Sequence, residues 1–512
     1  MTDQWKEFKQ IATEVKEPIR FFKLERGVAN VPATQFLISS LYRSIGLITL
    51  SEDSASINAE VLFAGMDFSK KLPLIFNNEQ FKKIIKGSLN FPKGNTKNEK
   101  QYLISPLIPE IAAFGGTMRR QSSWNAGKFI LQIISNCCND DEEFKEIIIE
   151  LYEALKVDIN KGSDAWSLLL VNEFKTINEN LTGHISCNQN NIDLISLIKE
   201  YRSAEVKLVL KDSNFSKNVI KDLKILIEIE KESNISRQQW VSLLETFFRL
   251  LIFNHIINTL NLSRSYFSIL TEILENDPNK IMDERMFEKF INLDFNQKSN
   301  IDKNLKVSTR SAFIDNNIHL YCLYNHFTYE ILQSNNVNIQ LNDSRNQFIS
   351  KTNILLQNFS NAEDLKLKFS EYKRLNEDIL KFISVKDRSL AQIQECLIYI
   401  GNKKVKEKEL KSYVPDVNFL FAQRKGIKGN PYMFELGSGT ISLLTGLIFR
   451  KRSAQNFISG MEYIKEMLNY NIDLNIQDIS SGEINLTMQS LGIVIDSPDT
   501  EGGVLIVKPG WV

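Results

Sequence analysis

The chain has 512 residues, of which 43% are hydrophobic and 24% are charged. This composition is close to that of an average globular protein, and it excludes wholesale disorder and fibrous structure. The 62 basic and 62 acidic residues cancel, which excludes a nucleic-acid coat protein that is basic throughout and a protein dominated by an acidic tail. At about 100 to 200 residues per domain, the length predicts about three domains.

Cysteine usage and hydropathy indicate where the protein works. Its five cysteines are few, odd in number and scattered, which argues against a disulfide framework and favours the reducing cytoplasm. The N-terminal residues MTDQWKEFKQ are mostly polar and lack the apolar core of a signal peptide. The most apolar stretch, residues 250–263, is interrupted by Asn and His and is shorter than the roughly 20 residues of a membrane span. We therefore expect a cytoplasmic protein without membrane contact, in which this stretch is a buried helix.

The pattern along the chain predicts a mainly α, multidomain protein. Residues 1–135 are the most mixed and are expected to form an α/β domain, and its candidate strands are residues 61–68 and 102–108. Residues 136–410 show one amphipathic pattern after another with few Pro and Gly, which predicts a helical body. The charge-rich segment 401–413 is the best domain boundary, and residues 411–512 form the C-terminal domain.

The clearest helix of the body is predicted at residues 236–262. Ser236 has the residue type of a helix cap. Glu245 and Arg249 are four positions apart and are expected to pair. Apolar residues at helical spacing form one stripe, made of Trp240, Leu243, Leu244, Phe247 and Leu251.

The C-terminal domain is predicted to contain three helices and a hairpin. The first helix covers residues 440–449, and the second covers residues 455–469, with Phe457, Met461, Ile464 and Leu468 on one face. Ser480 and Glu483 have the spacing of a capping box and would start the third helix, which carries Ile484, Met488 and Leu491. Residues 494–495 and 504–507 can pair as strands across the loop DSPDTEGG. Three helices followed by a hairpin is the order of a winged helix, so we expect a winged-helix-like domain.

The charge of this domain argues against DNA reading by its third helix. Helices that read DNA carry Lys, Arg, Asn or Gln toward bases and phosphates, but the sequence SGEINLTMQSLG has no Lys or Arg. Residues 456–512 hold eight acidic residues against two lysines, a net charge of −6. Because affinity for DNA rests largely on phosphate contacts, this domain is expected to bind protein or to pack on its own chain.

Positive charge is concentrated elsewhere. Residues 61–100 and residues 401–430 each hold eight basic residues against three acidic ones, and the cluster at residues 450–452 adds a shorter basic run. A charge run is commonly a solvated face, and the functional interpretation is a sequence-independent contact with DNA or with a protein partner. The candidate contact residues are Arg119, Arg120, Lys403, Lys404, Lys406, Lys408, Lys411, Arg424, Lys425 and Lys428.

Two groups of residues have the types that bind zinc. His319, Cys322 and His326 share one helical face, but their surroundings are apolar and no fourth ligand is evident. His184 and Cys187 have no second pair. We therefore predict no metal site and no cofactor.

Two further patterns resemble parts of anion-binding or catalytic sites. Gly437 and Gly439 precede a helix, but they fit neither a dinucleotide-binding motif nor a P-loop, so a structural turn is the favoured interpretation. The Asp-x-Lys pairs that a metal nuclease would place at the end of a strand lie here in helical patterns, at Asp222–Lys224 and Asp364–Lys366. The sequence therefore predicts no catalytic residue, and the protein is not expected to be an enzyme.

The last stretch of about 95 residues resembles a known family. The runs FLFAQRKGIKGNPYMFELGSGTISLLTGLIF, FISGMEYIKEMLNYNIDLNIQD and LTMQSLGIVIDSPDTEGGVLIVKP are similar to the end of the G component of bacterial phosphorothioation-dependent restriction systems, called DptG or DndG. The shared features are an R/K-x-G turn, a Phe-x-Leu strand entry, a helix and a final "LG…SPD…G…V" wing. The resemblance implies a non-catalytic partner of ATPase and helicase- or nuclease-like proteins, in a complex that attacks DNA lacking the host's sulfur marks.

Together with the features above, this resemblance implies a non-catalytic subunit of an antiviral DNA restriction complex that bridges ATPase or nuclease partners and DNA. The acidic winged-helix-like domain would bind protein, and the lysine-rich segments would contact the DNA backbone without reading its sequence. Two alternatives stay open: a DNA-binding regulator that reads sequence, and a nuclease with an unrecognised metal site.

Overall fold

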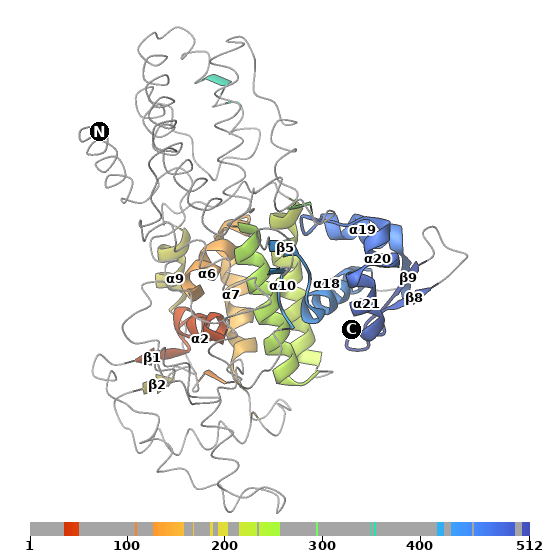
Figure 1. Cartoon of the computed structure of the whole chain (residues 1–512). Coiled ribbons are helices and arrows are strands. Elements are labelled where there is room, and N and C mark those ends of the chain that lie inside the picture. The colour runs from red at the N-terminus through yellow and green to blue at the C-terminus, as the bar shows by residue number, and fades with distance from the viewer. Residues whose placement is uncertain are drawn as a thin grey trace, which may run out of the picture.

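In the part of the chain that it describes, a computed structural model shows a mainly helical protein with a small antiparallel sheet (Figure 1). The residues that the structure describes are 35–50, 108–109, 126–157, 167, 185–187, 193–202, 214–232, 235–255, 293–294, 350, 353–354, 417–423, 432–452, 455–496 and 504–512. The mainly α fold class is therefore confirmed for this part. The strands predicted at 61–68 and, apart from Ile108, at 102–108 lie outside it, as does the connector 401–413.

The helical body, as the term is used below, consists of the described helices that precede residue 256. These helices are α2 (Gln35–Ser44), α6 (Ala126–Cys137), α7 (Asp141–Leu155), α9 (Leu194–Arg202), α10 (Asn214–Glu232) and the helical residues 237–255. A short antiparallel pair, β1 (Ile48–Leu50) with β2 (Ile185–Cys187), lies beside α2. Helix α6 continues through residue 135, where the sequence placed its first domain boundary.

Helices α2 and α6 touch through backbone at Gly127. A Cβ atom at this position would lie 2.3 Å from the carbonyl oxygen of Ser40, so only glycine allows this close approach. The Gly127 amide donates a hydrogen bond of 2.8 Å to the Ser40 hydroxyl. Packing at this point fixes α2 on α6.

The helix of residues 237–255 runs through the core of the body. Ser236 and Gln239 cap its start reciprocally, because the Gln239 amide donates to the Ser236 hydroxyl and the Ser236 amide donates to Gln239 Oε1. The predicted cap is therefore confirmed, and so is the apolar stripe, since all of its members are buried: Trp240, Leu243, Leu244, Phe247 and Leu251. Residues 250–255 are helical and buried as predicted.

This helix is tied to its neighbours by buried polar contacts. The Arg237 guanidinium donates to the carbonyls of Ala154, Leu155 and Lys156, which satisfies acceptors that the last turn of α7 leaves open. The Trp240 Nε1–H donates 2.7 Å to the Leu226 carbonyl of α10. These contacts orient the central helix against α7 and α10.

The C-terminal region, residues 417–512, stands beside α10 in Figure 1. Its elements are β4 (Phe421–Gln423), β5 (Tyr432–Phe434), α18 (Ser438–Lys451), β6 (Phe457–Ser459), α19 (Gly460–Leu468), β7 (Ile472–Asp473), α20 (Ile476–Ser480), α21 (Glu483–Ser490), β8 (Val494–Asp496) and β9 (Val504–Val507). Strands β4 and β5 pair antiparallel, and β7 pairs in parallel with β3 (Leu293–Asp294). Helix α18 contacts both α10 and α21, and almost every residue from Thr440 to Phe449 is buried. It therefore joins the region to the body.

The predicted hairpin is confirmed, and it belongs to a larger sheet. Strands β8 and β9 pair antiparallel with Ile495 opposite Leu505. Strand β6 pairs with the other edge of β9, which gives the sheet order β6-β9-β8. The side chains of Ile458, Val494 and Ile506 are buried on its inner face.

The second predicted helix starts later than expected. Phe457 and Ile458 belong to β6 because they pair with β9, and the helix α19 begins at Gly460. Its buried side is formed by Gly460, Tyr463, Ile464 and Met467, whereas Phe457 and Met461 are exposed. The prediction of one apolar helix face from 457 to 468 is therefore wrong. Residues 457–459 form a strand, and in a strand successive side chains point to opposite sides of the sheet.

The capping box predicted at Ser480 and Glu483 is also wrong. Ser480 is the last residue of α20, and Gly482 stands at the N-cap of α21 without a side-chain hydrogen bond. Capping boxes are instead formed before α19, by Ser459 with Glu462, and before α20, by Asn475 with Asp478. Within α21, Met488 is buried as predicted, whereas Leu491 is exposed.

Candidate functional site

None of the ten candidate contact residues lies in the part of the chain that the structure describes. Their positions fall in three segments outside it, around residues 119–120, 403–411 and 424–428. The assignment of DNA or partner contact to them therefore stays a prediction. His319, Cys322 and His326 also lie outside the described residues.

The basic cluster at residues 450–452 does lie in the described part, and its side chains face other parts of the protein. The Arg450 guanidinium donates a hydrogen bond of 2.8 Å to the Glu232 carboxylate at the end of α10. The Lys451 ammonium lies 2.6 Å from the Asp222 carboxylate of α10. Two of the three cations therefore bind the helical body and hold α18 on α10, rather than forming a free basic patch.

Asp222 is the buried centre of this junction. Its side chain is 2% exposed, whereas that of Lys451 is 23% exposed. The Lys451 ammonium also donates a hydrogen bond of 3.1 Å to the Tyr470 hydroxyl, and it lies over the Tyr470 ring. Burial raises the pKa of the Asp222 carboxyl to about 6, although the charge of Lys451 lowers it. The sequence pattern paired Asp222 with Lys224, but its cation comes from α18.

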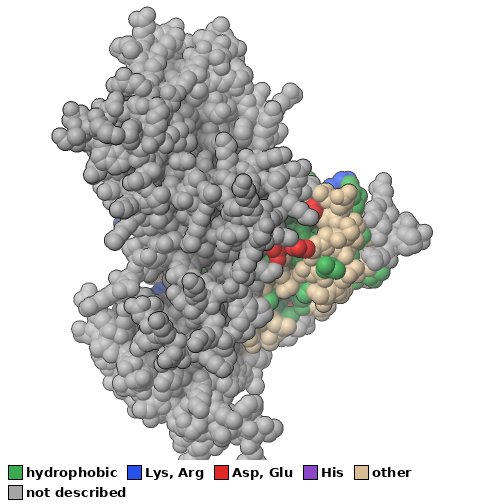
Figure 2. Space-filling view, in the orientation of Figure 1, with side chains coloured by type: hydrophobic (Ala, Val, Ile, Leu, Met, Phe, Trp, Pro, Cys, Tyr) green, Lys and Arg blue, Asp and Glu red, His purple; other side chains and the backbone are tan. Residues whose placement is uncertain are grey.

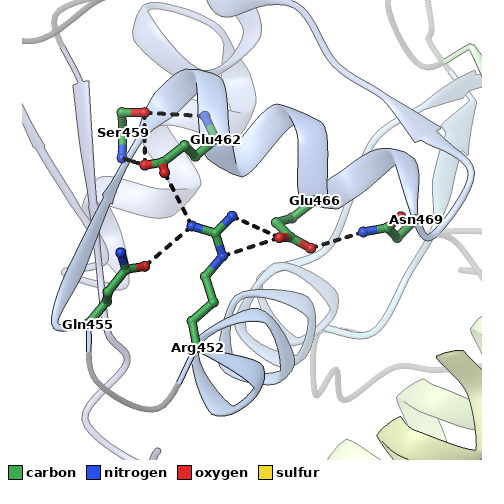
Figure 3. Close-up of polar contacts among 6 residues, drawn as sticks. All are labelled: Arg452, Gln455, Ser459, Glu462, Glu466 and Asn469. Carbon is green, nitrogen blue, oxygen red and sulfur yellow. Dashed lines mark hydrogen bonds and ion pairs between the residues drawn. The ribbon is translucent and has the colours of Figure 1, made fainter.

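Arg452, the third cation of the cluster, ties α18 to α19 (Figure 3). Its guanidinium donates two hydrogen bonds, of 2.9 Å and 3.2 Å, to Glu466 Oε1. It also donates hydrogen bonds to the side chains of Glu462 and Gln455. Glu462 accepts from the Ser459 amide as well, and this hydrogen bond is the main cause of its lowered pKa. Hydrogen bonding to Glu466 raises the pKa of Arg452. The Ser459 cap, the acidic side chains of α19 and the Arg452 guanidinium thus form one hydrogen-bond network.

Two further contacts fasten the C-terminal region to the central helix of the body. The Asn471 amide donates 3.3 Å to Asn254 Oδ1 within the core, and Asn471 has a positive φ of 59°, a conformation that Asn tolerates better than most residues. The Asn418 amide donates 3.2 Å to the Ser242 hydroxyl. These two hydrogen bonds add polar contacts to a junction at which α18 also buries apolar side chains.

Gly437 at the N-cap of α18 and Gly439 in its first turn have a structural role at the helix start, as predicted. The amides of Gly437 and Gly439 donate to the carbonyls of Phe419 and Val417, at 2.8 Å and 2.7 Å. A Cβ atom on Gly437 would lie 2.2 Å from the Val417 carbonyl oxygen. Because backbone carbonyls already accept from this helix start, it does not offer these amides to an anion.

The C-terminus is anchored on α18 by a contact that the sequence reasoning missed. A Cβ atom at Gly446 would lie 2.2 Å from the Trp511 ring, so glycine leaves the space into which the indole packs. The Trp511 Nε1–H donates 2.9 Å to the Ser442 hydroxyl. The small residue at 446 and the tryptophan near the end were the only signals, and nothing in sequence spacing joins them.

The outward side of the C-terminal sheet is apolar, and we call it the outer sheet face. It consists of the side chains that alternate with the buried row, namely Phe457, Ser459, Ile495, Leu505 and Val507. Phe457 is 61% exposed and Ile495 is 55% exposed. The sequence signal for this face was the unbroken apolar runs GIVI and GVLIV, which leave no polar side for the strands.

Helix α21 carries one exposed leucine among polar side chains. Leu486 is 64% exposed near its middle, and Glu483 and Gln489 are exposed beside it. Figure 2 shows the C-terminal region as the coloured part of this side of the molecule, where hydrophobic patches and acidic atoms lie among polar ones and basic atoms are confined to the upper edge. The exposed side chains of the region are thus apolar, neutral or acidic for the most part.

The described residues offer little to a metal-dependent reaction. Among them, no group of three or more His, Cys, Asp or Glu side chains lies close enough to hold a metal ion. Asp222 and Lys224 lie within α10, in a helix as predicted. Cys137 and Cys138 at the end of α6 do not form a disulfide.

Comparisons with known proteins add no relative to these observations. No family model, curated protein or solved structure matches the chain. In the part that the structure describes, no helix combines the length and the apolar character needed to cross a membrane.

Proposed function

We propose that this protein is a non-catalytic subunit of a bacterial anti-phage DNA restriction complex, and that its C-terminal region binds a partner protein of the ATPase, helicase or nuclease class. The class of complex comes from the resemblance of the C-terminal stretch to the DptG family. The role of the C-terminal region in binding rests on its surface. The main support is that Arg450, Lys451 and Arg452 all bind acidic side chains of the chain itself. In contrast, the apolar side chains of Phe457, Leu486 and Ile495 are exposed.

This arrangement favours a protein over a nucleic acid as the occupant. Phosphate contacts need cations that are free to approach the backbone of the nucleic acid, and residues 456–512 contribute only Lys465 and Lys508 against eight acids. Exposed apolar side chains such as those of Phe457, Leu486 and Ile495 are common at protein interaction sites.

We also propose that the C-terminal region is a winged-helix-like domain that serves as an adaptor. The order α18, β6, α19, α21, β8, β9 and the sheet order β6-β9-β8 support this fold. The short helix α20 and the strand β7 are additions to it. In such a fold α21 would occupy the place of the base-reading helix, and its exposed Leu486 suits an apolar contact.

DNA would be reached by other parts of the chain in this proposal. The lysine-rich segments that contain Lys403, Lys404 and Lys406 carry a net positive charge and suit contact with a phosphate backbone irrespective of sequence. The protein would thereby hold an enzyme partner close to DNA.

The test is affinity purification of the full chain from its native host at two salt concentrations, with identification of the proteins that remain bound in stoichiometric amounts. Recovery of an ATPase, helicase or nuclease subunit supports the proposal. A chain that purifies alone and binds one DNA sequence far more tightly than others would instead be a regulator. Metal-dependent cleavage of DNA by the purified chain would make it a nuclease, and either of these results contradicts the proposal.

A further inference from the structure

We propose that the contact of Asp222 with Lys451 and Tyr470 is a pH-sensitive latch between the helical body and the C-terminal region, which holds the two together more tightly in an acidic medium than at neutral pH. The structure contains the closed latch, in which Lys451 and Tyr470 lie against α10. In the open latch these two side chains have moved away and Asp222 faces water. This inference concerns regulation and does not depend on which partner the C-terminal region binds.

The latch is built from side chains of both parts of the chain. Asp222 belongs to α10, whereas Lys451 is the last residue of α18 and Tyr470 follows the end of α19. The Lys451 ammonium lies 2.6 Å from the Asp222 carboxylate, and the Tyr470 hydroxyl also hydrogen-bonds with this carboxylate. If the C-terminal region moves away from α10, Asp222 therefore loses both of these contacts at once.

The carboxyl group of the latch is buried more deeply than its cation. The Asp222 side chain is 2% exposed, whereas that of Lys451 is 23% exposed and keeps part of its contact with water. Removing a carboxylate from water costs free energy, which a single cation returns only in part. A neutral carboxylic acid costs less to bury and can both donate and accept a hydrogen bond. Closure of the latch therefore favours the protonated form of Asp222.

The groups that face Asp222 do not reverse this preference. Lys451 from α18, Tyr470 from the turn after α19 and Lys221 from α10 itself all lower the pKa of the carboxyl group. Burial outweighs them and raises this pKa to about 6 in the closed latch, whereas a carboxyl group of Asp in water has a pKa of about 3.9. Because the closed latch binds the proton more tightly, closure gains free energy as the pH falls through 6 and gains no more below 3.9.

A second ion pair at the junction responds to pH in the opposite direction. Glu232, which also belongs to α10, binds Arg450 of α18, and their side chains are 38% and 23% exposed. Protonation of Glu232 would remove its attraction to Arg450, and the junction would lose a little stability because the pair is largely solvated. Of these two acids, only the buried Asp222 can make the junction more stable in an acidic medium.

Opening of the latch can be measured by the labelling of a thiol that the closed junction covers. Asn254 is buried in the central helix, where it accepts a hydrogen bond from Asn471 of the C-terminal region. In Asn254→Cys, the new thiol should react with 4,4′-dithiodipyridine only when the junction opens, and mass spectrometry distinguishes it from the natural cysteines. Ala154→Cys, at a buried position of α7, is the matched control that reports opening of the body itself.

The pH dependence is read by comparison with Asp222→Asn, which resembles the neutral acid and does not titrate. Both chains contain His255, so its effect cancels in the ratio of their labelling rates, as does the pH dependence of the reagent. From pH 7 to pH 5, labelling at position 254 should slow about tenfold relative to the same thiol in Asp222→Asn. Glu232→Gln should keep this response, because it leaves Asp222 in place.

Three results would overturn the inference. The first is a ratio of labelling rates that stays constant or rises from pH 7 to pH 5, since Asp222 would then not favour closure in acid. The second is loss of the response in Glu232→Gln. The third is equal labelling of positions 254 and 154 at pH 7, because the junction would then open only when the body unfolds. This third result is read without Asp222→Asn, and none of the three bears on the proposed function.

Discussion

In the helical body, charged and polar side chains lie inside the core, whereas in the C-terminal region cations lie at the junction with the body and apolar side chains lie on the outer surface. Glu245 and Arg249 of the central helix are 3.8 Å apart and both buried, as is His255 nearby. In the C-terminal region, the buried side chains are mostly apolar, and Arg450, Lys451 and Arg452 face α10 and α19. The body thus holds polar groups in its core, whereas the cations of the C-terminal region bind acidic side chains of α10 and α19.

A basic run in a sequence therefore need not be a surface for phosphate. The run at 450–452 lies at the end of α18, where cations interact favourably with the helix dipole, and acids from two other helices take up its charge. An exposed apolar row then becomes the remaining feature by which the region can recognise another molecule.

The strongest test of the junction is removal of the cation that faces Asp222. In Lys451→Met, the carboxylate would be left buried without its cation, which is expected to lower the free energy of unfolding by about 3 kcal/mol at pH 7. Urea denaturation measures this loss. Lys145→Met on α7, which removes an exposed pair with Glu142, is the control and should cost less than about 0.5 kcal/mol.

A second variant decides whether the loss comes from the buried charge. Adding Asp222→Asn to Lys451→Met removes the carboxylate, and stability should recover by more than half. If the double variant is as unstable as the single one, the Asp222–Lys451 pair is not what holds α18 on α10.

The buried histidine of the body gives stability a defined pH dependence. Burial lowers the pKa of His255 to about 3, whereas in the unfolded chain it is about 6.5. Stability is therefore complete above pH 6.5 and falls between pH 6.5 and pH 3, because only the unfolded chain takes up the proton. Between pH 7 and pH 5 the loss due to His255 should be about 2 kcal/mol, so His255→Gln should reduce it by that amount in urea denaturation.

The contribution of Asp222 to the pH dependence of stability has the opposite sign. Its folded-state pKa of about 6 lies above the unfolded value of about 3.9, so its contribution to stability is complete below pH 3.9 and is lost as the pH rises toward 6. In Asp222→Asn, acidification from pH 6 to pH 4 should therefore be more destabilising than in the unmodified chain. Parallel pH profiles of the two chains would contradict this assignment.

The C-terminal anchor should be sensitive to any side chain at position 446. Gly446→Val would push the Trp511 ring out of its place and is expected to cost about 2 kcal/mol, measured by urea denaturation. Combined with Trp511→Ala, the added valine should cost much less, because the ring that it meets is gone. Additive losses in the double variant would show that the two residues do not share this contact.

The smallest expected effect concerns Arg452. Its side chain is 27% exposed, so Arg452→Met is expected to lower the free energy of unfolding by only about 1 kcal/mol. The loss should shrink in 1 M NaCl, where screening is strong. Lys465→Met, at an exposed position of α19, is the control, and an equal effect of the two substitutions would argue against the network of Figure 3.

Local patterns predicted much of the fold, and long-range pairing accounts for what they missed. The Ser236 cap, the stripe from Trp240 to Leu251 and the β8-β9 hairpin depend on residues close in sequence, and all three are confirmed. Phe457 was assigned to a helix because its apolar spacing fits one, but its strand partner Val507 lies far along the chain. Apolar spacing alone does not distinguish the two at such a boundary.

The candidate site was harder to predict for the same reason. Arg450 and Glu232 are 218 positions apart, so the sequence shows a basic run but not the acids that neutralise it. The acidic charge of the last residues was visible and argued for protein docking, whereas the outer sheet face depends on which residues of β6 and β9 share a side. That information comes only from the register.

The most direct test of the account is hydrogen–deuterium exchange of the full chain, alone, with its co-purified partner and with duplex DNA. We expect the partner to slow exchange at the edge strands β6 and β8, and we expect DNA to leave α21 unchanged. Protection of α21 by DNA, with β6 and β8 unaffected by the partner, would contradict the claim that this region recognises protein through an apolar face.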